Sequence, residues 1–542
     1  MRRKTFNRLT TVITLAFVFL STAAAFAQPR SLILLSTSDL QGQLEPLISR
    51  QDPGDGNATT ETGGFARMAS VIRSIKAENR GEVLTVVTGD DLMNKYFINF
   101  HGVPICEAMT TMGVDAATLG NHEFDLGPAV LAEGLAACRF PIVESNLRAK
   151  AGSPLANRFV PSLVVVRNGL KIGLFGLMTP ELPYISKAGP DIEASPDLAA
   201  AARAAIKQLK EEDKVDLVVA LTHIGLEEDK KLAAQVEGID VICSSHSHDM
   251  LHKNQEVVVR HPSGRYTVIV QTGTRGEYLG QLKLEVDDGR ISSYSWDPIR
   301  IGTDIAANAE VAALIASYRS KLPPKTIITT AAVPFDCRSE TLRAQEAPVG
   351  NLVADILRAY FKVDVALQNG GAIRGDRIVP AGPLSSEDVD TMFPFDNSVV
   401  IAKVPGKVLK DVLEYGVARL PDKFGGFPQV SGLRMAVDPG GAPMKLVFDS
   451  SNQPTGIDQS GARITKVEVL AKDGSYQPLN PDQEYTVAIN SFMAGGGDGY
   501  IMFKQSGALT FTYVSLKSVI ESALKGVPQI SAASEGRIQF VR

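Results

Sequence analysis

Short apolar runs recur along the chain from residue 31 onward, and polar or glycine residues follow most of them. We predict a strand in each run, because short apolar runs bounded by turn residues are typical of buried strands. The expected strands are 32–35, 83–87, 163–166, 172–177, 215–221 and 241–243. Residues 64–77 and 198–209 carry apolar side chains at helical spacing instead. Strands that are apolar throughout are buried on both faces, so we expect an α/β fold with helices over both faces.

The pattern changes after residue 300. Residues 306–322 are predicted to form one helix, which ends before Pro323 and Pro324. Glycine-rich loops and mixed strands follow, and no histidine occurs after His261. We interpret this helix as a connector between two domains, which suits a length of 542 residues. A long insertion in a single domain is the alternative.

The first residues are typical of an export signal. Four cations within residues 2–8 precede an apolar run over 9–20, and Ala25-Phe26-Ala27 follows. We therefore expect residues 1–27 to be a cleaved signal peptide, the protein to be periplasmic or secreted, and the mature chain to lack a stable membrane anchor. An N-terminal anchor is the alternative, although the run is shorter than the roughly 20 residues of a membrane span.

Composition narrows the class of protein. With 44% hydrophobic and 21% charged residues, the chain is neither disordered nor a polytopic membrane protein. Removal of residues 1–27 would move the formal charge from -5 to about -9, so we expect no nucleic-acid partner. The four cysteines, Cys106, Cys138, Cys243 and Cys337, lack the paired spacing of a zinc site and do not form a disulfide scaffold. They permit one incidental disulfide, with its pairing left open.

Polar side chains with metal-binding chemistry follow four of the predicted strands and a fifth short strand expected at 117–119. Ligands of open α/β sheets gather beyond the carboxyl ends of strands. Any one of these residues could simply form a turn, cap a helix or make a surface hydrogen bond. Together they indicate a shared site. The candidates are Asp39, Gln41, Asp90, Asn121, His122, Asp125, His223, His246 and His248.

Carboxylate and imidazole ligands together favour Zn²⁺, Mn²⁺ or Fe over Ca²⁺ or a metal that prefers thiolates. Two metals about 3.5–4 Å apart need a bridging ligand, and the sequence makes Asp90 the candidate. Such a pair activates water and stabilises the oxygens of an in-line displacement. The expected reaction is hydrolysis of a phosphate ester or anhydride.

The motifs Asp39-x-Gln41, Gly89-Asp90, 120–125 (GNHEFD), Thr222-His223 and His246-x-His248 resemble those of the calcineurin-like metallophosphatases. The run at 120–125 is similar to that of the 5′-nucleotidase, UDP-sugar hydrolase and 2′,3′-cyclic phosphodiesterase family. The resemblance implies an N-terminal metallophosphatase β-sandwich flanked by helices over 28–302, a linker helix over 303–325, and a mixed α+β substrate-binding domain over 326–542.

The same resemblance implies roles for the candidate residues. Asp39, Gln41, Asp90 and His248 would surround a first divalent metal, and Asp90, Asn121, His223 and His246 a second. His122 would contact the phosphate, with Asp125 orienting it. The family pattern has histidine where Gln41 stands, so we expect a weaker first site, or one biased toward Mn²⁺ or Mg²⁺ over Zn²⁺. The alternative is that Gln41 only donates or accepts hydrogen bonds behind a water ligand.

The second half carries its own motifs at 343–351, 368–374, 393–395 and 492–500. Their glycines permit close approach of a ligand, and their arginines match phosphate oxygens. Each could also be an ordinary turn or core segment. The resemblance implies that Arg343, Asn369 and Arg374 hold the phosphate or the base edge, Phe395 and Phe492 stack the base, and Asp498 binds ribose hydroxyls.

These observations predict a secreted two-metal phosphohydrolase, monomeric or weakly oligomeric, that removes phosphate from nucleoside 5′-monophosphates. UDP-sugars and 2′,3′-cyclic nucleotides are further candidate substrates. The alternatives are a sulfur-oxidation thiosulfohydrolase of the same superfamily and a non-catalytic nucleotide-binding protein. The aromatic residues argue against the first alternative, and the retained Asp90, His122 and Asp125 argue against the second.

Overall fold

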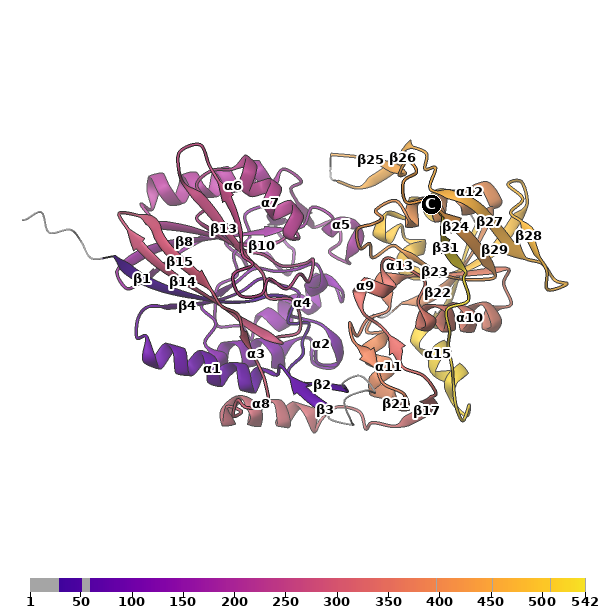
Figure 1. Ribbon diagram of the computed structural model, residues 1–542, viewed down its shortest axis with the longest axis horizontal. Coiled ribbons are helices and arrows are strands. Elements are labelled where there is room, and N and C mark those ends of the chain that lie inside the picture. Colours follow the sequence, from indigo (N-terminus) through magenta and orange to yellow (C-terminus); the bar gives the residue numbers. More distant parts are fainter. Residues whose placement is uncertain (1–28, 51–58, 396, 451, 507, 542) are drawn as a thin grey trace, which may run out of the picture.

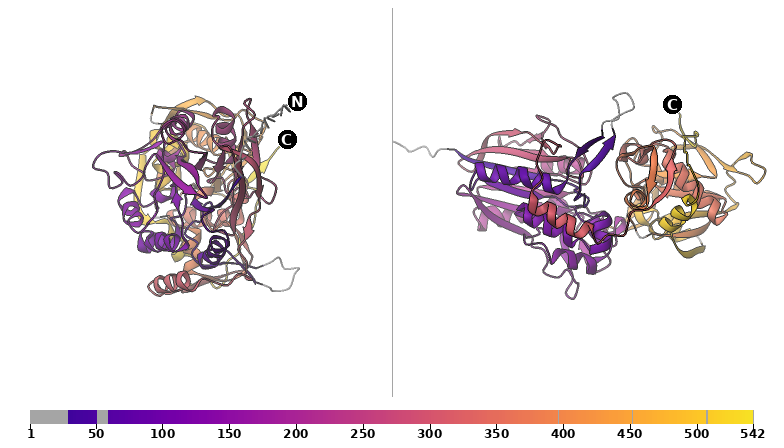
Figure 2. Two further views of the ribbon diagram at one scale, coloured as in Figure 1. Left: turned by 90° about the vertical axis from the view of Figure 1, so that its left-hand side faces the viewer. Right: turned by 90° about the horizontal axis from the view of Figure 1, so that it is seen from below.

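The computed structural model describes residues 29–50, 59–395, 397–450, 452–506 and 508–541, so the predicted signal peptide lies outside the described residues. The chain forms two lobes that lie side by side (Figures 1 and 2). Elements up to residue 319 build the first lobe, and elements from residue 327 build the second. No helix in the described segments is long and apolar enough to cross a membrane.

Two sheets face each other in the first lobe. The first sheet has the order β15(Arg290–Trp296)-β14(Tyr278–Asp287)-β1(Arg30–Thr37)-β4(Val83–Val87)-β5(Ala116–Ala117), with β16(Ile299–Arg300) paired to β14. The second sheet has the order β12(Val257–Arg260)-β13(Tyr266–Val270)-β11(Val241–Cys243)-β10(Leu217–His223)-β8(Leu170–Met178)-β7(Ser162–Arg167). Two short pairs of strands lie outside them: β2(Leu47–Arg50) with β3(Thr59–Thr62), and β6(Leu147–Ala149) with β9(Ile192–Ala194).

The predicted α/β fold, with a sandwich in its first half, is confirmed. The inner faces of the sheets meet in one apolar layer that includes Leu34, Leu84 and Val219. The outer faces lie under helices. The first sheet is covered by α1(Phe65–Glu78), α3(Val103–Met112) and α4(Pro128–Leu135), and the second by α6(Leu198–Lys207), with its continuation η2(Gln208–Glu212), and α7(Leu226–Gln235).

One detail of the prediction needs correction. The strands are buried on both faces as expected, but the inner face of each sheet is covered by the other sheet and not by helices. An apolar run indicates only that both faces of the strand are buried away from water. It cannot distinguish a helix from a second sheet as the cover.

The strands that carry the candidate ligands run parallel and end together. β1 pairs with β4, and β4 with β5, while β10 lies between β8 and β11, all in parallel. Their carboxyl ends therefore form one edge of the sandwich. The loops at this edge include the short helix η1(His122–Phe124), and they face the second lobe together with α2(Asn94–Phe100) and α5(Leu182–Ile185).

The predicted connecting helix is α8(Ala309–Arg319). Asn308 caps it by accepting hydrogen bonds from the backbone amides of Glu310 and Val311. Val311 and Ile315 are buried in the apolar core of the first lobe, against α1 and α3. The helix thus packs along the first lobe, and the chain crosses to the second lobe after it ends (Figure 2).

The second lobe combines a five-stranded mixed sheet with smaller sheets and surrounding helices. Its main sheet has the order β23(Pro428–Ser431)-β19(Val365–Asn369)-β29(Glu484–Asn490)-β22(Ser398–Pro405)-β30(Ala508–Ser515). The smaller sheets are β28(Tyr476–Pro478)-β27(Ile464–Leu470)-β24(Leu433–Val437)-β31(Ile538–Phe540), β17(Ile327–Ala331)-β21(Gly382–Ser385), β18(Phe335–Asp336)-β20(Ile378–Val379) and β25(Lys445–Phe448)-β26(Pro454–Gln459). The helices are α9(Ser339–Leu342), α10(Pro348–Phe361), η3(Gly370–Ala372), α11(Ser386–Met392), α12(Gly406–Gly416), α13(Ser491–Ala494), η4(Gly497–Gly499), α14(Ile501–Ser506) and α15(Leu516–Leu524).

The cysteines are placed by the same packing. Cys106 of α3 and Cys138, which follows α4, form a disulfide that joins these two helical segments of the first lobe. Cys243 and Cys337 are free and buried.

Candidate metal centre and cleft

The seven predicted ligands lie at the carboxyl ends of β1, β4, β5, β10 and β11: His223 is the last residue of β10, and the other six lie in the loops that follow the strands. Five of them adopt the left-handed backbone conformation, which is uncommon for residues other than glycine. The φ values of Asp39, Gln41, Asp90, His246 and His248 are 50°, 51°, 55°, 79° and 59°. Backbone strain of this kind is found where a site must aim its side chains, so the clustering supports a shared site.

One group of ligand atoms is ready for a metal ion. Asp90, His223 and His246 each bring a ligand atom to within 4.8 Å of the others. His223 Nε2 lies 3.1 Å from Asp90 Oδ2. Among the described residues, His223 Nε2 and Asn121 Oδ1 are buried without a hydrogen-bond partner. The Asn121 oxygen can only accept, and His223 Nε2 becomes an acceptor when the ring is neutral. A divalent cation between them would satisfy both atoms, so the residues fit the metal that the sequence predicts.

The charges of this group are strongly coupled. Burial alone would raise the pKa of Asp90, but His223 and His122 hold it well below its ordinary value. Burial alone would lower the pKa of His223, but the adjacent Asp90 carboxylate raises it to about 10. Burial and the His223 charge lower the pKa of His246. The centre thus holds an ionised carboxylate in a dry setting that favours a nearby cation.

The remaining predicted ligands form a second group beside the first. His248 Nε2 lies 3.4 Å from Asp39 Oδ1 and 3.1 Å from Gln41 Nε2. The Gln41 Oε1 atom faces the buried Arg275, whose Nε lies 3.4 Å away. Arg275 also donates its backbone N–H to Asp39 O, 2.7 Å away. The three predicted ligands converge, and Arg275 ties two of them to one loop.

Glu123 is a site residue to which sequence reasoning gave no role. Its buried carboxylate accepts hydrogen bonds from the backbone amides of Asp90, Asp91, Leu92 and Gly120, at 2.6–3.0 Å. It therefore fixes the loops after β4 and β5 to each other. An acidic residue inside the GNHEFD run was the available signal.

His122 and Asp125 form a pair as predicted from the motif. His122 Nδ1 lies 2.7 Å from Asp125 Oδ2, so the carboxylate orients the ring. The other ring nitrogen, Nε2, lies 2.8 Å from Arg374 Nη2 of the second lobe. The His122 backbone N–H donates to Asp90 Oδ1, 2.8 Å away. A histidine of the first lobe and an arginine of the second lobe therefore meet beside the metal centre.

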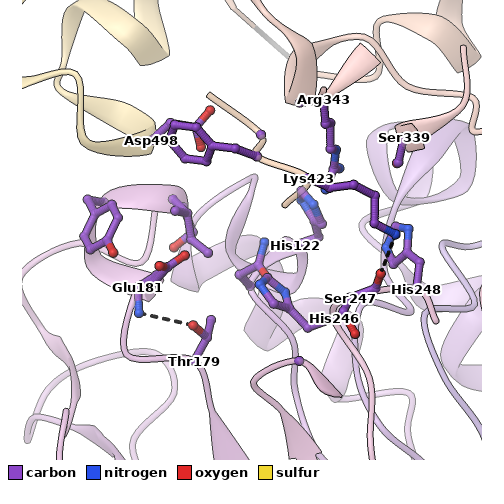
Figure 3. A pocket seen from close by; sticks show the side chains of 18 of the residues that line it. His122, Thr179, Glu181, His246, Ser247, His248, Ser339, Arg343, Lys423 and Asp498 are labelled. Carbon is purple, nitrogen blue, oxygen red and sulfur yellow. Dashed lines mark hydrogen bonds between the residues drawn. The ribbon is translucent and has the colours of Figure 1, made fainter. Parts of the chain in front are cut away.

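A cleft of about 960 Å³ runs between the lobes and contains this meeting point. Figure 3 shows His122, His246 and His248 on the first-lobe side, with Arg343, Lys423 and Asp498 opposite them. All six predicted substrate-binding residues line the cleft: Arg343, Asn369, Arg374, Phe395, Phe492 and Asp498. Asp39, Gln41, Asp90 and His223 lie deeper and are buried.

The cleft has more aromatic lining than the two phenylalanines that the sequence predicts for it. Phe424 lines it and stands beside Gly425, where an added Cβ would lie 3.5 Å from Asp498 Oδ1. An aromatic residue before two glycines was the signal for Phe424. Phe448, on the β25–β26 hairpin, also lines the cleft and lies 5.9 Å from the Tyr184 ring of the first lobe.

Phe395, which the sequence predicts to stack a base, makes a different contact. Its ring stacks on His122, with centroids 5.7 Å apart. The Arg374 guanidinium also lies over it, 5.7 Å from the ring centroid. Phe395 therefore packs against the two cation-forming side chains beside the metal centre.

A dry carboxylate–imidazole centre at strand ends, with a histidine and two arginines facing a cleft, defines a metal-dependent phosphoesterase. The comparisons agree. The family model of calcineurin-like phosphoesterases matches residues 34–250, and that of the 5′-nucleotidase C-terminal domain matches residues 327–505. The chain belongs to the 5′-nucleotidase family.

Relatives resemble the chain over nearly its whole length. The structure of a 5′-nucleotidase precursor from Thermus thermophilus is 30% identical, with a TM-score of 0.86 over 94% of this chain and 99% of that one. The 5′-nucleotidase of Homo sapiens is 29% identical over 93% of this chain and 91% of its own. A sulfate thiohydrolase from Thermus thermophilus is 18% identical, with a TM-score of 0.73 over 94% of this chain and 96% of that one, which shows a shared fold.

Proposed function

We propose that the protein is a two-metal phosphohydrolase that removes phosphate from nucleoside 5′-monophosphates. The proposal rests mainly on one observation: a candidate metal centre and a candidate nucleoside-binding cluster face each other across one cleft. The centre of Asp90, His223 and His246 lies on one side, and the cluster of Asn369 and Asp498 lies on the other. The first suits a phosphate and the second suits a nucleoside.

In this proposal Asp39, Gln41, Asp90 and His248 would hold one divalent ion, and Asp90, Asn121, His223 and His246 would hold another. The ions supply an activated water and neutralise phosphate charge. Zn²⁺, Mn²⁺ and Mg²⁺ are the candidates, with Mn²⁺ or Mg²⁺ favoured at the first site because Gln41 would offer an amide oxygen where the family pattern has an imidazole. To do so, Gln41 Oε1 would have to exchange its contact with Arg275 for the ion.

The chain's own groups position the phosphate and receive the developing charge. Arg374 Nη2 lies 2.8 Å from His122 Nε2, so the guanidinium donates to the ring in this structure. We place the phosphate at this meeting point, where one of its oxygens would replace the contact and accept hydrogen bonds from both side chains. Asp125 fixes the His122 ring through Nδ1. As water adds to phosphorus, the bond to O5′ breaks, and the nucleoside and inorganic phosphate leave.

The second lobe selects the nucleoside. Asn369 donates to Asp498 Oδ2 across 2.7 Å, which leaves the other Asp498 oxygen for ribose hydroxyls. We place the base between Phe492 and Phe424, which lie near Asp498: an added Cβ at Gly497 would touch the Phe492 ring at 2.6 Å. Phe395 lines the same cleft with its ring stacked on His122, and we propose that it borders the base from the phosphate end.

UDP-sugars and 2′,3′-cyclic nucleotides are second candidates, and the size of the cleft leaves room for the larger UDP-sugars. At about 960 Å³ it reaches the upper range of small-molecule sites, and it continues past the metal centre toward Tyr184 and Lys187. A thiosulfohydrolase activity has less support, because a sulfonate offers nothing for Phe424, Phe492 and Asp498 to bind.

Two further predictions from the sequence stay proposals. We propose export to the periplasm or the medium on the basis of residues 1–27. We also propose the domain boundaries 28–302 and 326–542, with the segment after α8 as the flexible part of the 303–325 linker, because α8 itself is packed into the first lobe.

The test is phosphate release from AMP, UDP-glucose and 2′,3′-cyclic AMP, each with Mn²⁺ and with excess chelator. We expect metal-dependent release from AMP that exceeds any release from the other two. Release of sulfate from a thiosulfonate with none from AMP would favour the thiosulfohydrolase. No turnover of any substrate would leave only a nucleotide-binding protein.

A further inference from the structure

One contact across the cleft reaches a predicted metal ligand instead of the cleft itself. Asp376 of the second lobe places Oδ2 3.3 Å from Nδ1 of His248. Both side chains are largely buried, with 15% and 8% of their side-chain surface exposed. The contact therefore lies in a dry part of the interface.

Asp376 is held ready for this contact by its own lobe. Its Oδ1 accepts a hydrogen bond from the backbone N–H of Ser339, 2.7 Å away, at the start of α9. Its backbone has a φ of 40°, and Gly375 before it has a φ of 113°. Ser339 is seen beside His248 in Figure 3. The loop is thus shaped to aim the carboxylate outward, at the first lobe.

The partner surface on the first lobe suits an acidic group. His248 uses Nε2 toward Asp39 and Gln41, so Nδ1 carries the proton when Nε2 binds a metal. Arg275, whose Nε lies 3.4 Å from Gln41 Oε1, adds a buried positive charge that acts on Asp376. A carboxylate that accepts a hydrogen bond from Nδ1–H fixes the ring plane and the direction of Nε2.

We propose that Asp376 is a positioning residue of the first metal site, supplied by the opposite lobe, so that ion affinity at that site depends on the lobes being together. This inference rests on the proposed function, because it takes His248 as a ligand. By linkage, if contact between the lobes increases ion affinity at that site, a bound ion stabilises the contact between the lobes by the same factor. Partners of this kind change ion affinity by about 10–100-fold.

Other cross-cleft contacts lie away from the predicted ligands and provide a matched control. Glu387 of α11 pairs with Lys95 of α2, so Glu387→Gln removes an acidic side chain of the second lobe from an interface ion pair without touching the centre. Asp376→Asn keeps the size of the side chain and removes its charge. Asp376→Ala serves as a second variant.

The experiment is a titration of the full chain with Mn²⁺. Binding is measured by calorimetry and, independently, by the electron-spin-resonance signal of free Mn²⁺. Two sites are expected in the wild type. Asp376→Asn should weaken one of them about tenfold or more and leave the other unchanged, while Glu387→Gln should leave both within about twofold. Melting of the metal-free variants shows whether each is folded.

The outcomes separate the two claims. If the wild type binds two ions and hydrolyses AMP but Asp376→Asn and Asp376→Ala bind both ions as tightly as the wild type, the inference is wrong and the proposed function stands. If Glu387→Gln weakens Mn²⁺ binding as much as Asp376→Asn does, the inference is also wrong, because any loss of contact between the lobes would then have the same effect. A wild type that binds no ion overturns both.

Discussion

Gly120 is the residue at which the smallest change should most damage the metal centre. It precedes Asn121, and its φ is not in the left-handed region, so an alanine could adopt its backbone conformation. An added Cβ would nevertheless lie 2.2 Å from Asp90 Oδ1, 2.4 Å from the Asp90 amide nitrogen and 2.7 Å from His223 Cε1. Contacts under 3.0 Å are not tolerated, so Asp90 must retreat by about 1 Å.

A displacement of that size moves the carboxylate that both predicted sites share. Misplacement by about 1 Å costs about 100-fold in rate, or about 2.7 kcal/mol of transition-state stabilisation. We therefore expect Gly120→Ala to lower kcat/KM for AMP about 100-fold and to weaken Mn²⁺ binding in the same preparation. Gly456→Ala is the control, because an added Cβ at Gly456 meets nothing within 4 Å.

The assay combines phosphate release, Mn²⁺ titration and thermal melting of both variants. A folded Gly120→Ala protein with activity and ion affinity within about twofold of the wild type would refute the placement of Asp90 at the centre. Loss of activity with unchanged ion affinity would refute the bridging role while leaving Asp90 near the reaction.

Four further changes test other parts of the site. Asp125→Asn should lower kcat for AMP at least about tenfold with little change in KM, in steady-state kinetics, because it loosens His122. Phe424→Ala should raise KM for AMP and spare turnover of p-nitrophenyl phosphate, which lacks a base; equal losses would contradict base stacking. Gln41→His should shift metal preference toward Zn²⁺ in competition assays, and an unchanged preference would contradict a weakened first site. Burial raises the pKa of Glu144 to about 8, so the native protein keeps a proton that the unfolded chain loses near pH 4.5. The free energy of unfolding, measured with denaturant in the presence of chelator, should therefore fall between about pH 4.5 and 8. The Glu144→Gln variant should show a flatter pH profile.

The sequence predicts the first lobe well because its strands are uninterrupted apolar runs. β4 and β11 have the predicted bounds, and β1, β8 and β10 extend or shift by a few residues. The prediction that helices cover the inner faces was wrong, because a strand buried under a helix and a strand buried under a second sheet have the same apolar sequence pattern. The convergence of Asp90, His223 and His246 follows from parallel strands whose carboxyl ends meet at one edge.

What the sequence does not predict depends on contacts between distant segments. Glu123 acts through four backbone amides, and nothing in its neighbours' identities reveals which loop it fixes. Asp376 meets His248 only because the two lobes face each other. Phe424 lies in a turn between two packed segments, so its approach to Asp498 depends on how the second lobe folds rather than on local spacing.

The most direct test of the account is a crystal structure of the protein grown with Mn²⁺, with anomalous diffraction recorded at the manganese edge. We predict two peaks about 3.5–4 Å apart, one on each side of Asp90. Asn121, His223 and His246 should contact one ion, and Asp39 and His248 the other. A single peak, or peaks away from these side chains, would contradict it.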